Sequence, residues 1–540
     1  MSPLLLLLVA AAPRPAIPAD AKTAMEALTV AKVKAHLTFL GDDLLEGRGT
    51  GTRGHELAAK YVASQLEAAG LEPAGSEGWF QPVKLRETAA DPKACAMTLV
   101  RDGKRTPLVW GDDFIVRGRP AVETSEVEAP VVFVGFGLTA PDRGWDDYAG
   151  VDVKGKLVAV VYDVPTQFAS EEAASRTSSE EVDRNAAAHG AIGVLHLGTP
   201  ALEKMLPWKR IVANAVFPAM IWFKADGSIA KSFPELKVGG LLSPQLSARL
   251  FEKAPKSFEQ ALEGLKDKQP HPFELPVKLS VKSVAKHRDL TSPNVVGVLR
   301  GSDPKLKDEY VVYSSHLDHL GIGQPVDGDS IYNGVVDNAS GSAVLVSLAQ
   351  TFAAMPKKPK RSLLFVFTTA EEKGLLGADA FAEHPTVPVK SMVANINMDG
   401  ASLFYPFDDV VALGETHSTL HAQVAKAAAE LGLTVSPDPQ PDQAYFVRSD
   451  QFPFVLAGVP AVFTSEGFKA KDKAFDARKF AEQWVSTRYH APSDDLKQPL
   501  AWDAAVEYGQ FHFLLGYHVA QDPARPAWNK GDYFGEHAPK

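Results

Sequence analysis

The stretch LLFVFTTAEEKGLLGADAF, residues 363–381, contains the pattern that decides the fold. An uninterrupted apolar run is followed by two adjacent carboxylates, Glu371 and Glu372, and then by a glycine and a helix-like segment. A short continuous apolar run is typical of a strand that is buried on both faces of a sheet. Paired glutamates alone are most simply a solvated helix start. Only the rest of the chain shows whether these two charges belong to a site.

The same alternation of strand and helix continues along the chain from residue 294. Strands are predicted over residues 310–314, 363–368, 393–397 and 461–464, and helices over residues 340–354, 375–383, 419–431 and 501–519. Continuous apolar strands that alternate with helices indicate a mostly parallel, mixed sheet with helices on both faces. The predicted fold class is therefore α/β.

A change of pattern divides the chain into domains. From about residue 120 to about residue 287, short β-runs are separated by turns that contain Pro, Asp and Gly. We therefore predict a β-rich domain over residues 120–287. It is inserted into a discontinuous domain of residues 22–119 and 288–523, and residues 524–540 are predicted to be a loosely attached tail.

The composition narrows the classes of function. The chain has 540 residues, a net charge of -10 and 45% hydrophobic content, which describe a globular protein of more than one domain. No strongly basic stretch is present, so nucleic acid is not expected as a partner. Cys95 is the single cysteine, so neither an intramolecular disulfide nor a thiolate metal site can form. Any metal must be held by His, Asp and Glu.

Residues 1–21 are predicted to be a signal peptide. The apolar run over residues 4–12 is too short to span a bilayer and suits the core of a secretory signal, although the usual preceding positive charge is missing. No later segment reaches the roughly 18 uninterrupted apolar residues of a membrane span. We therefore expect an exported protein, periplasmic or extracellular, without a transmembrane segment.

Imidazoles and carboxylates follow the predicted strands, where ligands bind in open α/β sheets. They lie in SSHLDHLG, NGVVDNASG, TTAEEKG, NINMDG and STRYHAPSDD. A mixture of His and carboxylate ligands suits zinc, and also cobalt or manganese. Each residue alone is more typical of a structural role. Their convergence on one edge of a sheet indicates a site in which one carboxylate bridges two metals.

Six motifs together resemble the bacterial secreted zinc aminopeptidases of metallopeptidase family M28: SSHLDHLG, YNGVVDNASG, TTAEEKGLLGADAF, NINMDG, VRSDQF and YHAPSDD. The segment LTFLGDDLLEGRGTGTRGHELAAKYVASQL is similar to the opening helices of that family. In the insert, DDYAGVDVKGKLVAVVYDVP and NAAAHGAIGVLHLG resemble a protease-associated (PA) domain. The resemblance implies a zinc-peptidase-like α/β sheet with a PA-like insert.

The resemblance also implies a role for each site residue. Two zinc ions per chain would have five ligands, with Asp337 bridging both ions: His316 and Asp399 for one, and Glu372 and His490 for the other. Glu371 would not bind metal but would be the general base that takes a proton from the metal-activated water. The peptide between Asp337 and Asn338 is expected to be cis, as is common in the family.

Further residues are predicted to support the site. Asp318 and Asp494 follow His316 and His490 at short spacing and are predicted to orient those imidazoles, with a turn or cap role as the alternative. Asp450 lies in a motif where the family usually has Ser-Asp-His, but Gln451 replaces that histidine. His319 is predicted to pack its loop rather than to bind metal. Tyr445 and Arg448 are candidates for contact with the substrate.

These features predict an exported aminopeptidase that removes N-terminal residues from peptides with a free N-terminus. Three alternatives share the fold: a glutaminyl cyclase, a carboxypeptidase and a non-catalytic binding relative. The filled ligand set disfavours the last, since such relatives typically lose ligands. The PA-like insert is expected to be either a lid that filters substrates or a solubilising insertion.

Overall fold

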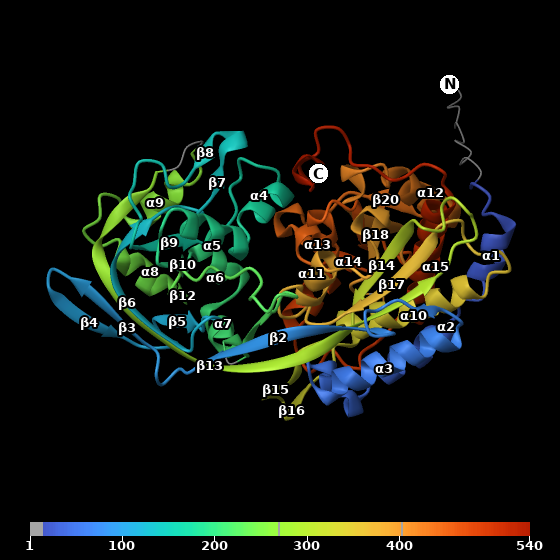
Figure 1. Cartoon of the computed structure of the whole chain (residues 1–540), viewed down its shortest axis with the longest axis horizontal. Coiled ribbons are helices and arrows are strands. Elements are labelled where there is room, and N and C mark those ends of the chain that lie inside the picture. The colour runs from blue at the N-terminus through green and yellow to red at the C-terminus, as the bar shows by residue number, and fades with distance from the viewer. Residues whose placement is uncertain (1–13, 216, 268–270, 401–402, 540) are drawn as a thin grey trace, which may run out of the picture.

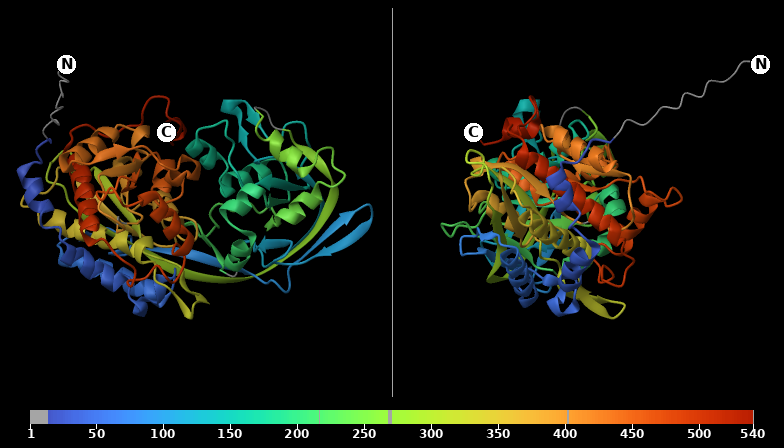
Figure 2. Two further views of the ribbon diagram at one scale, coloured as in Figure 1. Left: turned by 180° about the vertical axis from the view of Figure 1, so that it is seen from behind. Right: turned by 90° about the vertical axis from the view of Figure 1, so that its right-hand side faces the viewer.

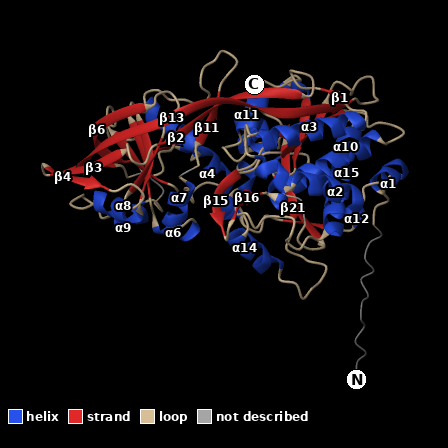
Figure 3. Cartoon of the chain, turned by 90° about the horizontal axis from the view of Figure 1, so that it is seen from below, coloured by secondary structure: helices blue, strands red, loops and turns tan. Residues whose placement is uncertain are grey.

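A pair of long antiparallel strands joins the two lobes of the molecule (Figure 1). The protein is seen in a computed structural model that describes residues 14–215, 217–267, 271–400 and 403–539. The two strands are β2 (Phe80–Ala90) and β13 (Phe273–Leu299), and β13 continues into a sheet in each lobe. Figure 3 shows them running along one edge of the molecule, from one lobe to the other.

The main lobe contains a sheet whose central strands run parallel. Its order is β20 (Thr434–Ser436), β19 (Asp409–Leu413), β21 (Ala461–Glu466), β18 (Met392–Asn397), β14 (Tyr310–His316), β17 (Ser362–Thr368) and the C-terminal part of β13. The pairs β17–β14, β14–β18 and β18–β21 are parallel, whereas the outer neighbours of β17 and β21, which are β13 and β19, run antiparallel to them. The predicted fold class is confirmed.

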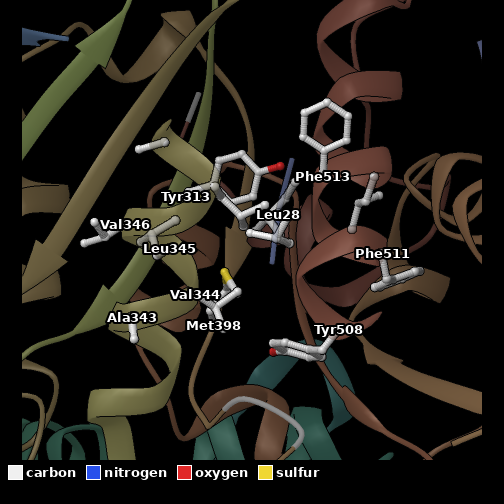
Figure 4. Packing of buried hydrophobic residues seen from close by; sticks show 14 of the residues in the cluster. Leu28, Tyr313, Ala343, Val344, Leu345, Val346, Met398, Tyr508, Phe511 and Phe513 are labelled. Carbon is white, nitrogen blue, oxygen red and sulfur yellow. The ribbon is translucent and has the colours of Figure 1, made fainter. Parts of the chain in front are cut away.

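Helices cover both faces of this sheet because successive side chains of a strand point to opposite sides. On one side, Tyr313 of β14 packs with residues of α2 (Val30–Leu40), α10 (Gly341–Ala353), α12 (His421–Leu431) and α15 (Trp502–Gln521). Figure 4 shows Tyr313 between Leu345 of α10 and Phe513 of α15. On the other side, Val312 packs with residues of α11 (Leu376–Glu383) and α13 (Gln451–Leu456).

The insert lobe has its own mixed sheet, to which the N-terminal part of β13 contributes. Its order is β4 (Lys104–Leu108), β3 (Ala96–Arg101), β13, β6 (Thr124–Phe133), β9 (Leu157–Val161), β10 (Gly193–Leu197), β12 (Val238–Leu242) and β5 (Phe114–Arg117). Helices α5 (Ser179–Ala188), α8 (Pro244–Leu250) and α9 (Phe258–Gly264) contribute side chains to its core clusters.

The insert sheet begins earlier in the chain than the predicted boundary at residue 120. Strands β3, β4 and β5 all precede that residue, and Met97 and Phe114 lie in the apolar core of the insert lobe. In the opposite direction, β11 (Ala219–Trp222) lies within the predicted insert but pairs with β2. The predicted boundary at residue 120 therefore does not coincide with the boundary between the two sheets: β3, β4 and β5 belong to the insert sheet, and β11 pairs with β2.

The first and last described helices of the chain pack on the main lobe (Figure 2). The C-terminal residues, predicted to be loosely attached, form α16 (Tyr533–His537), where Phe534 is only 4% exposed and packs against Phe446 and Trp528. Near the N-terminus, α1 (Ala19–Met25) packs on α15, so the last residues of the predicted signal peptide are part of the fold. Residues 1–13 lie outside the described residues. No helix within the described ranges combines the length and apolar character that crossing a bilayer requires.

A histidine between two carboxylates links the lobes at a second place. His417 Nε2 lies 2.7 Å from Glu171 Oε2 in α4 (Ser170–Arg176) of the insert lobe, and Nδ1 lies 2.5 Å from Asp532 Oδ2 beside α16. Burial alone would lower the pKa of His417, but the hydrogen bonds and negative charges of Glu171 and Asp532 raise it above its ordinary value.

The contact of His417 should make the stability of the protein depend on pH. Because its pKa is higher in the folded protein than the unfolded value of about 6.5, its contribution is complete below about pH 6.5 and is lost as the pH rises through the folded pKa. His417→Gln should therefore flatten the fall in Tm between about pH 6 and pH 9 by roughly 1–2 °C. The exposed neighbour His421 offers a control, His421→Gln. Equal pH slopes for wild type and His417→Gln would contradict this prediction.

Candidate metal centre

The carboxyl ends of the parallel strands bring the five predicted ligands together. His316 is the last residue of β14, Glu372 follows β17 and Asp399 follows β18. Asp337 lies in the turn that opens α10, and His490 lies in the loop after helix α14 (Ala477–Thr487). Residues that are far apart in the sequence therefore meet at one edge of the sheet, where the strand ends predicted a site.

Asp337 lies between two imidazoles. Its Oδ1 is 3.2 Å from His316 Nε2 and its Oδ2 is 3.2 Å from His490 Nε2. On the outer sides, Asp399 Oδ1 is 3.1 Å from His316 Nε2 and Glu372 Oε2 is 3.1 Å from His490 Nε2. Two donors about 2.0 Å from a zinc ion at a tetrahedral angle lie about 3.3 Å apart. All four separations therefore suit two cations that share Asp337.

The orientation of His316 suits a metal ligand. Its Nδ1 lies 3.1 Å from the backbone oxygen of Asp318, to which an Nδ1–H would donate. In that tautomer the lone pair of Nε2 points at the oxygens of Asp337 and Asp399. The backbone of the loop thus leaves Nε2 free to bind a cation. The peptide between Asp337 and Asn338 is cis, as expected.

The negative charge of the cluster determines its protonation. Burial alone would lower the pKa of His490, but Glu372 and Asp337 raise it to about 10. Burial likewise opposes ionisation of the two carboxylates, yet the imidazoles hold the pKa of Asp337 and of Glu372 well below the usual range. A site that attracts protons this strongly also attracts divalent cations, and a metal that binds there releases protons.

Donor atoms gather in two clusters that share Asp337: the first also contains His316 and Asp399, and the second also contains His319 and Glu372. Glu371 lies beside these ligands but belongs to neither cluster. Its backbone N–H donates to Asp318 Oδ1 at 3.0 Å, which fixes the turn after β17. Burial, together with the charges of Asp399 and Glu372, raises the pKa of Glu371 well above its ordinary value, although His316 opposes the shift. A carboxylate that binds a proton more readily than usual suits a general base.

The site lies in a segment of the chain that matches a known protein family. Residues 294–514, which include all five ligands and Glu371, match the model of peptidase family M28. This region is an M28 peptidase domain. A solved structure, the aminopeptidase from Aneurinibacillus sp. strain AM-1, superposes with a TM-score of 0.55 and 18% identity, covering 95% of this chain and 99% of that one. It shares the fold of both lobes.

Two curated relatives resemble parts of the chain. The "Probable glutamate carboxypeptidase" of Arthroderma benhamiae is 28% identical over 278 residues, which are 46% of this chain and 33% of the relative. "Aminopeptidase NAALADL1" of Mus musculus is 36% identical over 129 residues, 23% of this chain and 15% of the relative. The chain thus spans a third or less of the length of these relatives. One relative is named as a carboxypeptidase and the other as an aminopeptidase.

His319 lies in the second cluster of the M28 domain, although the sequence analysis assigned it to loop packing. Its Nδ1 is 2.6 Å from Glu372 Oε1 and 3.9 Å from Asp337 Oδ2. Despite the short distance, an N–H of this ring does not point at Glu372, and neither ring nitrogen has a hydrogen-bond partner among the described residues. The ring is fully buried, so it offers a further donor to a cation on that side. Its place in DHLG, three residues after His316, was the available signal.

Asp318 and Asp494 do not orient the imidazoles with their side chains, as the sequence analysis predicted. The carboxylate of Asp318 accepts hydrogen bonds from Glu371 N and from Thr50 Oγ1, at 3.0 Å and 2.9 Å. The carboxylate of Asp494 accepts from the backbone N–H groups of Val336 and Asp337 at 3.0–3.1 Å. Both carboxylates therefore hold the backbone of the turns that carry Glu371 and Asp337, since backbone N–H groups need acceptors when buried.

The VRSDQF motif contributes through its serine as well as its aspartate. Ser449 Oγ donates to Asp399 Oδ2 at 2.6 Å, a contact that sequence analysis missed. Asp450 accepts a hydrogen bond from Thr368, and burial raises the pKa of Asp450 to about 7. Gln451, which stands where the family usually has His, accepts from Asn397 Nδ2 at 2.8 Å and so extends a neutral polar network behind β18.

Tyr445 and Arg448, the candidates for substrate contact, lie next to each other in the loop before α13. The guanidinium of Arg448 lies over the ring of Tyr445, 5.4 Å from its centroid, and Arg448 is exposed whereas Tyr445 is half-buried. The short helical turn of Tyr445–Val447 also contacts α4 of the insert lobe. No described contact joins either residue to the five ligands, so their role stays a prediction.

Proposed function

We propose that the protein is a metal-dependent exopeptidase that removes N-terminal residues from peptides and holds two zinc ions per chain. The observation that carries the proposal is the position of Asp337, which has one oxygen near His316 and the other near His490. His316, Asp399 and Asp337 would hold one ion, and Glu372, His490 and Asp337 the other. Cobalt and manganese suit the same ligands.

Glu371 would perform the proton transfers of the reaction. When bound, the two cations would act as Lewis acids and lower the pKa of water towards about 7. Glu371 would accept the proton of the attacking water and return it to the leaving amine. Its raised pKa supports this role because the group must bind the proton and release it in one cycle.

A panel of aminoacyl-nitroanilides tests this proposal. Each substrate is offered with a free and with a blocked amine, and each reaction is run with and without a metal chelator. We expect cleavage only of the free-amine substrates, loss of cleavage with chelator, and recovery when zinc is added back. Cleavage that is insensitive to chelator, or equal for blocked and free amines, would contradict an aminopeptidase that depends on metal.

The alternative activities of the same fold would give other results. A carboxypeptidase would release the C-terminal residue of an N-blocked peptide, and a glutaminyl cyclase would convert an N-terminal Gln to pyroglutamate. A non-catalytic relative would turn over none of these substrates, and a calorimetric titration would show no zinc binding. The place of Glu371 beside a filled ligand set supports a catalyst over a binding protein.

The insert lobe, which resembles a PA domain in sequence, is proposed to be a lid over this site. Arg210 Nη2 of the insert lobe donates to the backbone oxygen of Tyr489, the neighbour of His490, at 3.4 Å. Phe217 packs edge-on against Tyr332 at 6.3 Å between centroids, and Lys373, which follows Glu372, lies 5.7 Å from the Phe217 ring. These contacts place residues of the insert against two of the ligand loops.

The lid is best tested by a point substitution, because deleting residues 120–287 would cut β13 and remove β11, one of the two partners of β2. Phe217→Ala removes two ring contacts, so we expect kcat/KM for peptides of about ten residues to rise roughly two- to tenfold relative to that for aminoacyl-nitroanilides. The exposed residue Phe39 provides a control, Phe39→Ala. A change shared by substrates of all lengths would argue against a filter.

Export to the periplasm or the medium is also proposed, on the strength of the apolar run over residues 4–12. Free peptides would be the substrates available there. Determining the N-terminus of the protein recovered outside the cytoplasm would test this directly. A protein recovered with its first residues intact from the cytoplasm would contradict it.

A further inference from the structure

A tight turn directs one arginine beneath the metal centre. Glu46, Gly47 and Arg48 have consecutive left-handed φ angles of 50°, 65° and 49°. Gly47 is required in this turn because a Cβ there would lie 2.2 Å from the backbone oxygen of Tyr332. The turn points the side chain of Arg48 into the protein, where the residue is only 1% exposed. It lies in the Gly-rich stretch that the proposed function leaves without a role.

The guanidinium of Arg48 makes its hydrogen bonds to the backbone. It donates four hydrogen bonds to carbonyl oxygens: Nε to Leu317 at 2.9 Å, Nη1 to Leu40 at 2.6 Å and to Asn333 at 2.6 Å, and Nη2 to Gly334 at 2.9 Å. A planar fork of donors fits several acceptors in fixed directions, which a lysine cannot reproduce. A buried cation that has no direct ion pair needs such acceptors.

Three of these carbonyls, those of Leu317, Asn333 and Gly334, belong to the loops that carry His316 and Asp337, whereas the carbonyl of Leu40 lies at the end of α2. Leu317 directly follows His316, and Gly334 precedes Asp337 by three residues. One guanidinium therefore spans the loop after β14 and the turn before α10. Burial lowers the pKa of Arg48 to about 10, so the group stays charged at neutral pH.

A second contact from the same segment reaches the candidate base. Thr50 Oγ1 donates to Asp318 Oδ2 at 2.9 Å, and Asp318 Oδ1 accepts from Glu371 N at 3.0 Å. Thr50 and Asp318 are both buried. The hydroxyl of Thr50 therefore holds the carboxylate whose other oxygen holds the backbone of Glu371.

We propose that Arg48 and Thr50 are positioning residues of the metal centre. Arg48 sets the distance between the loops of His316 and Asp337, and Thr50 acts through Asp318 to place Glu371. The inference rests on the proposed function, since it assigns these residues to the metals and the base of that site. Neither residue touches the substrate or the reacting atoms in this assignment.

Arg48→Lys tests the first role. The variant keeps the charge but loses the fork, so we expect two zinc ions to bind with roughly 10–100-fold weaker affinity, the usual cost of losing an outer partner of a metal site. Affinity is measured by competition with a chelator of known strength, and geometry by the visible spectrum of the cobalt-loaded protein, which should change. Arg53→Lys, at an exposed arginine of the next helix, is the matched control.

Thr50→Val tests the second role and guards against misfolding of the arginine variant. It removes one hydroxyl at nearly constant shape, so kcat at saturating zinc should fall roughly tenfold or more while KM and zinc affinity stay unchanged. Thr50→Ser keeps the hydroxyl and should restore kcat.

The outcomes separate the two levels of inference. Wild-type protein that binds no zinc would overturn the proposed function and this inference together. The positioning roles alone would be overturned by a different result, in which the wild-type protein binds zinc and both variants behave like it. In that case Arg48→Lys would have the zinc affinity and cobalt spectrum of the wild type, and Thr50→Val would have its kcat. Loss of Tm without either change would assign both residues to folding stability.

Discussion

Glu371→Gln is expected to lower kcat by about 10²–10⁴-fold, the usual contribution of a general base. The amide has nearly the same size as the carboxylate but cannot accept the proton of the attacking water. The backbone N–H of Glu371 still donates to Asp318, so the turn and the ligands should keep their places. Steady-state kinetics on a free-amine nitroanilide, together with metal analysis, checks this result.

The informative comparison is between activity and metal content. Both zinc ions should remain bound in Glu371→Gln, because Glu371 belongs to neither donor cluster. Glu383→Gln, at a half-exposed glutamate of α11, is a control that should retain normal turnover. Normal turnover of Glu371→Gln would show that the proton is taken by another group, and loss of zinc would place Glu371 among the ligands.

Asp337→Asn is expected to abolish activity and to leave at most one tightly bound metal. The substitution removes the charge that both ions would share. The fall in metal affinity should therefore exceed the roughly 10–100-fold that is usual when an outer partner of a metal site is lost. The substitution would also remove a carboxylate that raises the pKa of His316 and of His490. Fewer protons would then compete with the metal for these imidazoles, but the site would attract the cations less strongly. Metal analysis after dialysis and the activity panel check both parts.

A matched control lies ten residues earlier. Asp327 is an exposed residue of the β15 (Gly321–Val326) to β16 (Asp329–Tyr332) hairpin with a φ of 52°, a conformation that Asn also accepts. Asp327→Asn should behave as wild type. Two tightly bound zinc ions in Asp337→Asn would mean that the clusters do not share this carboxylate.

The sheet and the ligands were predictable because each depends on a local signal. Residues 363–367 are apolar without interruption, which is the pattern of a strand covered on both faces, and the structure confirms β17 there. Ligand residues follow such strands directly, so the motifs and the predicted sheet both indicated a site at the same edge. The length of β13 and its pairing in both lobes were not predictable. Apolar and polar residues alternate over residues 273–284, which is typical of any half-exposed strand and does not reveal the partner strand.

Other features depend on contacts between distant segments. The docking of α16 rests on Phe534 meeting Phe446 and Phe452, which lie some way back in the chain and have ordinary apolar surroundings in the sequence. His319 meets Arg48, which is far away in the sequence and whose backbone oxygen accepts from His319 N at 3.2 Å. A sequence shows that such residues exist, but their pairing is a property of the folded chain.

The 27 residues of β13 would measure about 90 Å as an extended strand. Two lobes tied by a flexible linker can swing freely, whereas here the connection is a hydrogen-bonded ribbon that bends and twists as an elastic beam. If the insert lobe opened away from the sheet edge that carries the ligands, the bent ribbon would therefore store elastic energy and release it on closure. Substitution of a residue in the middle of that ribbon, far from any ligand, would change the stiffness of the ribbon and hence the fraction of time that the insert lobe stands open.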